Sequence, residues 1–122
     1  MLGSTGADTV DGGAGNDIVR GGQDDDAVFG WGGADWLSGD RGADTLQGGA
    51  GADTFHVFAE SGVDLVLDFN AAEGDRVNLL AGTQYATAQM GADTVITLTG
   101  GGEMILVGVQ LSSLPAGWIY GA

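Results

Sequence analysis

The sequence predicts an all-β protein, a parallel β-roll in which two nine-residue repeats make one coil, followed by a β-rich C-terminal cap. Three observations predict this fold class. A nine-residue pattern repeats six times in register over residues 3–56, glycine supplies 25 of the 122 residues, and the half that follows the repeats has no helical hydrophobic period of useful length. The hydrophobic fraction of 43% argues against low-complexity disorder, which usually lacks such apolar content. We expect one domain in two parts, the roll over residues 1–56 and the cap over 57–122.

Three columns of the repeat are regular. Written in nines from Gly3, the copies are GSTGADTVD, GGAGNDIVR, GGQDDDAVF, GWGGADWLS, GDRGADTLQ and GGAGADTFH. Position four is glycine in five copies, and Asp24 in the third copy is expected to be a tolerated variant, although it could also add a ligand or weaken its turn. Position one is always glycine, position six is Asp8, Asp17, Asp26, Asp35, Asp44 and Asp53, and position eight is Val10, Val19, Val28, Leu37, Leu46 and Phe55.

Each copy predicts one turn and one short strand. The first six residues are rich in glycine, which adopts backbone angles that side chains forbid, so they can form a turn with carbonyl groups pointing inward. The last three residues form a strand in which position eight faces the core and positions seven and nine face outward. Two copies complete one coil, so the turns of every second copy stack. The stacking places Asp8, Asp26 and Asp44 along one edge, and Asp17, Asp35 and Asp53 along the other.

The stacked aspartates predict a calcium site. Carboxylates one coil apart would lie about 4.8 Å from each other, the spacing of neighbouring strands. Like charges at that distance are costly unless a cation lies between them. Carboxylates and carbonyls form an all-oxygen shell, which suits calcium rather than zinc or copper, while magnesium demands a tighter octahedron. The absence of cysteine excludes disulfides and thiolate metal sites.

The nonapeptide resembles the unit of the repeats-in-toxin (RTX) family, G-G-x-G-x-D-x-U-x with U apolar, which forms a calcium-binding parallel β-roll. The resemblance implies that each ion lies between adjacent turns, held by two aspartates and several carbonyls. Four full sites follow from the pairs 8/26, 26/44, 17/35 and 35/53, and a fifth from Asp64 with Asp44, so four to six Ca²⁺ ions are expected. The implied carbonyl ligands belong to Gly12, Ala14, Gly21, Gln23, Gly30, Gly32, Gly39, Arg41, Gly48 and Ala50.

The nonapeptide stops after residue 56, and the second half predicts a cap that closes the open end of the roll. Strands are expected at 63–69, 75–80, 93–99 and 103–109, separated by turns at 70–74, Gly82 and 100–102. Residues 61–79 also resemble the segment that follows the repeats in many family members. Asp64 and Asp68 could each bind calcium or satisfy backbone groups, and we favour Asp64 as the ligand.

The uncharged tail, LVGVQLSSLPAGWIYGA, resembles the C-terminal ends of proteins exported by bacterial type I secretion systems, whose signal is not cleaved. This resemblance implies a secreted bacterial protein, with the secretion apparatus as partner. The alternative is that Leu111, Leu114, Trp118, Ile119 and Tyr120 pack on the cap. The N-terminus carries no secretory signal peptide and starts inside the pattern, so we expect a covalently linked upstream domain.

Charge limits the partners. The net charge is −14, with three arginines as the only basic residues, which disfavours nucleic acid and anionic membranes. No run approaches the roughly 20 apolar residues of a membrane span, so membrane insertion is not expected.

A lone histidine, His56 at an outward position, predicts a residue on the sheet surface rather than a transition-metal ligand or part of a catalytic set, and no catalysis is expected in this chain. Phe29, Trp31 and Trp36 form either a docking patch for a sugar or a neighbouring domain, or surface that packs on the C-terminal segment or is exposed by chance.

The leading hypothesis is a module that folds on calcium binding outside the cell and supports secretion of a larger protein. The alternatives are a module that binds polysaccharide or a partner, and the accessory C-terminal domain of a secreted protease or lipase.

Overall fold

The computed structural model describes residues 8–59 and 61–121. The repeats form six three-residue strands, and in every one the middle residue is buried, which confirms the predicted inward position. Residues 3–7 of the first copy and Glu60 lie outside the described residues. The strands are β1 (Thr9–Asp11), β2 (Ile18–Arg20), β3 (Ala27–Phe29), β4 (Trp36–Ser38), β5 (Thr45–Gln47) and β6 (Thr54–His56).

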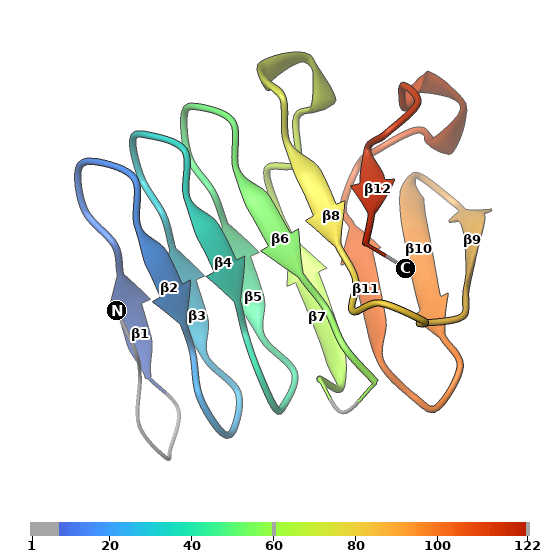
Figure 1. The fold of residues 1–122 in the computed structure, drawn as a ribbon, viewed down its shortest axis with the longest axis horizontal. Coiled ribbons are helices and arrows are strands. Elements are labelled where there is room, and N and C mark those ends of the chain that lie inside the picture. The colour runs from blue at the N-terminus through green and yellow to red at the C-terminus, as the bar shows by residue number, and fades with distance from the viewer. Residues whose placement is uncertain (1–7, 60, 122) are drawn as a thin grey trace.

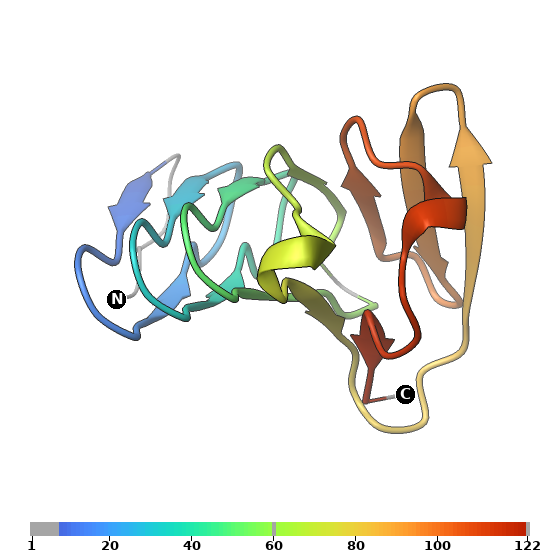
Figure 2. The same cartoon turned by 90° about the horizontal axis from the view of Figure 1, so that it is seen from above.

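These strands alternate between two facing sheets, as the coil predicts (Figures 1 and 2). Odd-numbered strands of the roll join a seven-stranded sheet in the order β1-β3-β5-β7-β11-β10-β9, and even-numbered strands join a five-stranded sheet in the order β12-β8-β6-β4-β2. The pairing is parallel, and its register equals two copies of the repeat: Val10 lies opposite Val28, and Val28 opposite Leu46. The predicted parallel β-roll is therefore confirmed.

The two sheets continue past residue 56, with longer coils. Strand β7 (Val63–Val66) pairs with β5 and places Leu65 opposite Thr45, while β8 (Arg76–Asn78) pairs with β6 and places Arg76 opposite Thr54. The residues added before β8 form the single-turn 3₁₀ helix η1 (Ala71–Glu73). Its first turn is capped by Asn70, whose side chain accepts a hydrogen bond from the N–H of Ala72 at 3.0 Å.

The last strands close the end of the roll. Strands β9 (Tyr85–Met90), β10 (Asp93–Leu98) and β11 (Glu103–Leu106) form an antiparallel meander, and β11 pairs in parallel with β7. After the 3₁₀ helix η2 (Leu111–Ser113), the two-residue strand β12 (Ile119–Tyr120) pairs with β8. All four predicted ranges contain a strand, but β9 and β12 were not predicted. No helix within the described residues is both long and apolar enough to cross a membrane.

In each turn of the repeats that the structure describes, the residues at positions two and four have a left-handed backbone conformation, with positive φ. Most of these residues are glycine, for example Gly49 with φ of 79° and Gly51 with φ of 104°. The only non-glycine residues with positive φ in the described chain are Asp24 at position four, and Trp31 and Asp40 at position two. Asp24 therefore takes the same turn conformation as glycine, as expected of a tolerated variant, since Asp and Asn adopt this region more readily than other side chains.

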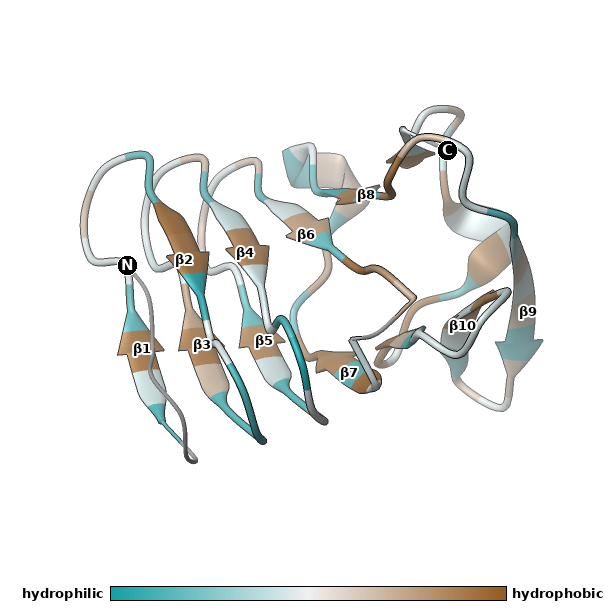
Figure 3. Cartoon of the chain, turned by 60° about the horizontal axis from the view of Figure 1, so that its bottom comes forward, coloured by the Kyte–Doolittle hydropathy of each residue, from teal (hydrophilic) through white to brown (hydrophobic). Residues whose placement is uncertain are grey.

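One narrow core runs through both parts of the chain. The centres of the roll strands are apolar, as the colours of Figure 3 show, and the side chains at these centres line the space between the two sheets. At the cap end, the Phe55 ring lies 5.9 Å from that of Phe69, which contacts Trp118 edge-on at 6.4 Å. Leu114, Trp118 and Ile119 pack against this core, as in the alternative reading of the tail, whereas Tyr120 is 43% exposed.

Candidate metal centre

The position-six aspartates stack through one repeated contact. The Oδ1 atom of each aspartate accepts a hydrogen bond from the backbone N–H of the aspartate one coil earlier. The distances are 2.8 Å for Asp26 with Asp8, 2.8 Å for Asp35 with Asp17, 2.7 Å for Asp44 with Asp26 and 2.9 Å for Asp53 with Asp35. The sequence-predicted residues therefore lie in two rows, one at each edge of the roll.

Both rows extend into the cap. Asp64 Oδ1 accepts from the N–H of Asp44 at 3.1 Å, which brings together the less regular fifth pair. Asp75 Oδ1 accepts from the N–H of Asp53 at 2.8 Å in the same manner. Sequence reasoning missed Asp75 because its coil is 22 residues long. A signal was present, since Asp75 is followed two residues later by the buried Val77, as in the repeat.

The second carboxylate oxygen has no partner among the residues that the structure describes. The Oδ2 atoms of six aspartates are buried and accept no hydrogen bond from those residues; they belong to Asp17, Asp26, Asp35, Asp44, Asp53 and Asp64. A buried polar atom without a partner costs roughly 1–3 kcal/mol, and more when it is charged. Buried unpaired groups are rare, so a regular row of them points to a ligand, and a carboxylate oxygen calls for a cation.

The position-one glycines leave space beside these oxygens. A Cβ atom on Gly21 would lie 2.8 Å from Asp26 Oδ2 and 2.9 Å from the carbonyl oxygen of Gly39. On Gly30 it would lie 2.6 Å from Asp35 Oδ2 and 2.9 Å from the carbonyl oxygen of Gly48. Carboxylate and carbonyl oxygens of stacked turns thus face the same small space, which a side chain at position one would fill.

The ten carbonyls that the RTX resemblance implies as ligands are free of hydrogen bonds to other described residues. Among the residues that the structure describes, no group of three or more His, Cys, Asp or Glu side chains could hold a metal ion by itself. An ion between the turns would therefore need backbone oxygens in addition to the two carboxylates. This donor set is rich in oxygen and suits calcium.

Burial raises the pKa of six aspartates in the rows, namely Asp26, Asp35, Asp44, Asp53, Asp64 and Asp75. It raises the pKa of Asp53 to about 7, with the charges of Asp75 and Asp35 adding to the effect. Asp44 and Asp64 also have raised pKa values, again from burial first, and the charge of each neighbouring carboxylate disfavours ionisation further. The metal-free fold therefore holds protons that the unfolded chain releases near its ordinary pKa of 3.8.

This pKa shift predicts opposite pH dependence with and without calcium. Without metal, the stability contributed by Asp53 is fully present below about pH 4 and is lost as the pH rises through about 7. With calcium, protons compete for the same oxygens, so the apparent calcium affinity should fall as the pH falls through about 7. Circular dichroism of protein freed of metal on a chelating resin, and calcium titrations across this range, check both trends. A calcium affinity independent of pH would contradict the assignment.

Asp68 has a different role from the row aspartates. Its Oδ1 accepts from the N–H of Gly48 at 2.9 Å and its Oδ2 from the N–H of Gly49 at 2.8 Å. Both oxygens are thus used to satisfy the backbone of the stacked turn. Of the two acidic residues weighed in this segment, Asp64 keeps a free buried oxygen and Asp68 does not.

Asn substitutions should separate these roles. Asp44→Asn should remove the ions of both pairs to which Asp44 belongs, and each ion lost should cost about 2.7 kcal/mol of stability when calcium is at 100 times its Kd. Asp68→Asn should leave the number of bound ions unchanged, because it removes only a bond to backbone. Calorimetric titration gives the stoichiometry and thermal unfolding gives the stability. Equal ion loss in both variants would contradict the distinction.

The three aromatic residues considered as one patch, Phe29, Trp31 and Trp36, are divided between the two sheets. Phe29 lies on the seven-stranded sheet and stacks on Trp31 at 5.6 Å, whereas Trp36 lies on the five-stranded sheet and stacks on His56 at 4.9 Å. His56 faces outward, but it is only 8% exposed, so the predicted surface position is covered by neighbouring side chains. It is covered by Trp36 and Phe58, and its Nδ1 donates to the backbone oxygen of Asn78 at 3.1 Å.

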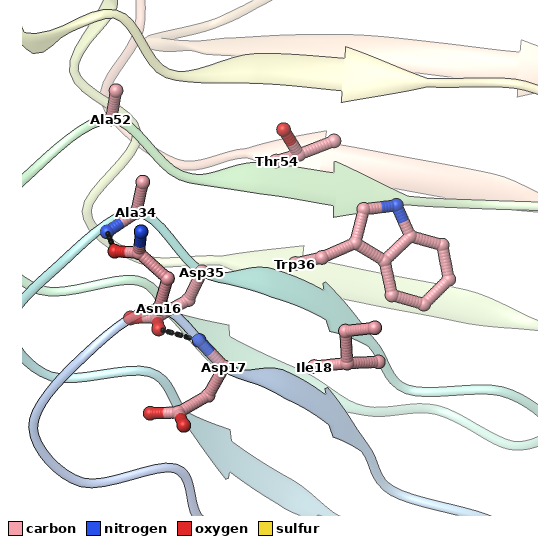
Figure 4. A pocket seen from close by; sticks show the side chains of 8 residues that line it. All are labelled: Asn16, Asp17, Ile18, Ala34, Asp35, Trp36, Ala52 and Thr54. Atoms are coloured by element: carbon pink, nitrogen blue, oxygen red, sulfur yellow. Dashed lines mark hydrogen bonds between the residues drawn. The ribbon is translucent and has the colours of Figure 1, made fainter.

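A shallow hollow of about 230 Å³ lies beside Trp36, where Ile18, Trp36 and Thr54 occupy neighbouring strands (Figure 4). The Asn16 side chain at its rim accepts a hydrogen bond from the N–H of Ala34 at 2.8 Å. This contact links position five of one coil to position five of the next.

Comparison with known proteins supports the geometry. Residues 2–37 and 30–66 match the family model of the RTX calcium-binding nonapeptide repeat (4 copies). Among curated proteins, none matches this chain.

Solved structures share the fold. The AlgE6R3 subunit of the Azotobacter vinelandii mannuronan C5-epimerase is 27% identical with a TM-score of 0.70, over 93% of this chain and 77% of that one. The AlgE6R2 subunit is 27% identical with a TM-score of 0.63, over 100% of this chain and 92% of that one. The extracellular lipase LipA from Serratia marcescens has a TM-score of 0.60 and 23% identity, which shows the fold alone; the match covers 91% of this chain and 20% of the lipase.

Proposed function

Because the chain belongs to the family of RTX calcium-binding nonapeptide repeats, we propose that it is a module that folds when calcium binds outside the cell and that supports the export of a larger protein. The observation that carries the proposal is the pair of aspartate rows, in which six buried carboxylate oxygens have no hydrogen-bond partner among the described residues. These oxygens disfavour the folded state until a cation satisfies them.

The residues that would hold calcium come from stacked turns. Each site would use the free Oδ2 of a position-six aspartate, the carboxylate one coil away, and the unbonded carbonyls at positions one and three. Calcium bound there supplies positive charge between like-charged carboxylates. The glycines hold the turns open, the aspartates neutralise the charge, and the position-eight residues fill the core. Asp75 is the terminal member of its row, since its Oδ2 already accepts from the N–H of Asn70 at 2.9 Å.

The calcium dependence would make the module a switch. Weak extracellular calcium modules have dissociation constants of about 10⁻⁴–10⁻³ M. Affinity in this range leaves the chain unfolded at the low free calcium of a cytosol, where an unfolded chain can pass through an exporter. The higher calcium outside would then fold the roll and oppose return of the chain. Residues 57–122 would cap the roll and carry the export signal at the uncharged C-terminal end.

The experiment that tests this function is secretion of a passenger protein fused to the N-terminus of the chain. In cells with a type I exporter, the fusion should reach the medium, where it should acquire β structure only when calcium is added. The matched control is the same fusion with a folded domain appended after the C-terminus, which blocks a C-terminal signal. Equal release with and without the exporter would overturn the export role while leaving calcium-dependent folding intact.

A further inference from the structure

The basic residues of this acidic chain are not spread over its surface. The sequence has only three, all arginines, against 17 acidic residues. Arg20 ends β2 and Arg76 begins β8, both strands of the five-stranded sheet, and Arg41 lies in the turn that leaves β4 of the same sheet. We infer that the outer face of this sheet, at Arg20, Arg41, Phe58 and Trp36, binds an acidic glycan through its carboxylate groups and sugar rings.

Arg20 is held in a fixed position by a buried partner. Its Nε donates to both carboxylate oxygens of Asp40, at 3.2 Å and 3.0 Å. Asp40 is 8% exposed and is itself fixed by Ser38, whose Oγ donates to Asp40 Oδ1 at 2.7 Å. The two Nη groups of Arg20 make no hydrogen bond to any residue that the structure describes, so they remain available to an outside carboxylate. Arginine pairs with carboxylates through such parallel N–H groups.

A hollow joins the two arginines. It measures about 340 Å³ and is lined by Arg20, Gly22, Gln23, Asp40, Arg41 and Phe58. The Asp40 carboxylate already accepts from Arg20 and Ser38, so it does not leave an unpaired charge facing an anion. The exposed Arg41 side chain adds a second guanidinium, and Phe58 supplies an apolar wall. The hollow is thus complementary in charge to a carboxylate, although the chain as a whole is strongly negative.

An aromatic ladder leads away from this hollow across the sheet. Phe58 stacks on His56 at 5.9 Å, and His56 stacks on Trp36 at 4.9 Å. Trp36 and Phe58 are half-buried and keep part of their surface open, while His56 is buried between them. Ring faces on a flat sheet suit sugar rings, and the arginines suit carboxylates, so together they fit a chain of acidic sugars. The combination favours a glycan over a peptide of acidic residues alone, such as poly-glutamate, which would lack rings for the ladder.

The test uses the calcium-loaded protein with free calcium held constant, after β structure and ion uptake have been verified. A short oligogalacturonate should bind, and a neutral cello-oligosaccharide of equal length should not. Arg41→Gln should weaken binding about ten-fold, the loss of one charged hydrogen bond. Trp36→Ala should weaken it about five-fold, the loss of one ring contact. Indole NMR signals should identify Trp36, and not Trp31, as the tryptophan that shifts.

Two variants serve as matched controls. Arg76→Gln removes the same charge outside the hollow, and Trp31→Ala removes an exposed indole that lies against Phe29 instead. Both should bind the oligogalacturonate like the unmodified protein. The inference is overturned by no binding, by equal binding of the neutral sugar or of poly-glutamate, or by equal losses in Arg76→Gln and Arg41→Gln. A sulfated oligosaccharide that binds more tightly than the uronate would overturn the choice of carboxylate. None of these results would bear on calcium-dependent folding.

Discussion

Removal of calcium is expected to abolish the β structure of the roll. The metal-free fold would carry six buried carboxylate oxygens that have no partner in the described part of the chain, and the net charge of the chain is −14. Each ion at 100 times its Kd contributes about 2.7 kcal/mol to stability. Several ions together therefore match the roughly 5–15 kcal/mol that separates folded from unfolded states in a typical domain. Far-UV circular dichroism near neutral pH, with excess chelator and then with calcium restored, measures the effect.

Magnesium provides the control for this prediction. At the same concentration it should restore little β signal, because it demands near-ideal octahedral geometry and gives up its water reluctantly. Sodium at matched ionic strength should also fail, which separates a specific site from screening of the negative charge. A protein that keeps its full β signal in chelator would show that the core alone stabilises the roll.

The substitution Gly51→Ala should strongly destabilise the roll, whereas Gly15→Ala should not. Both glycines occupy position four and have left-handed backbones, with φ of 104° and 95°. A Cβ on Gly51 would lie 2.4 Å from the carbonyl oxygen of Gly33 in the stacked turn, and a Cβ on Gly15 would meet no atom of the described residues within 4 Å. Gly15→Ala should therefore cost only about 1–2 kcal/mol for the backbone conformation. Gly51→Ala adds a steric cost of about 1–3 kcal/mol.

Chemical unfolding in saturating calcium measures this difference. The pair is informative because the two substitutions are chemically identical and sit at the same repeat position. Only the presence of a stacked turn against the new methyl group differs between them. Equal destabilisation by both would mean that the turns do not stack as closely as the structure shows.

The repeat made the roll predictable to the residue. One apolar position and one aspartate in each copy gave the buried strand centres, the register of two copies and the two carboxylate rows. These features depend on contacts between identical positions, so any one copy predicts the next. The exception is Asp75. Its coil contains the additional residues of η1 and Gly74, so Asp75 does not fall at a multiple of nine residues from the other aspartates of the two rows.

Features outside the repeat were harder to predict because they depend on contacts distant in sequence. The strand β9 is almost fully exposed and rich in alanine, so it lacks the alternation that marks a half-buried strand. The burial of His56 depends on Phe58, which follows the last copy, and on Trp36 from the neighbouring coil. Trp31 and Trp36 are close in sequence, yet the rings on which they stack lie on opposite sheets. Trp31 stacks on Phe29 of the seven-stranded sheet, and Trp36 stacks on His56 of the five-stranded sheet.

Anomalous diffraction from crystals grown in calcium tests the central claim most directly. The account predicts calcium peaks between stacked turns, each beside a free Oδ2 of Asp17, Asp26, Asp35, Asp44, Asp53 or Asp64. Rows without any peak, or carboxylates rotated away from one another in ample calcium, would contradict it.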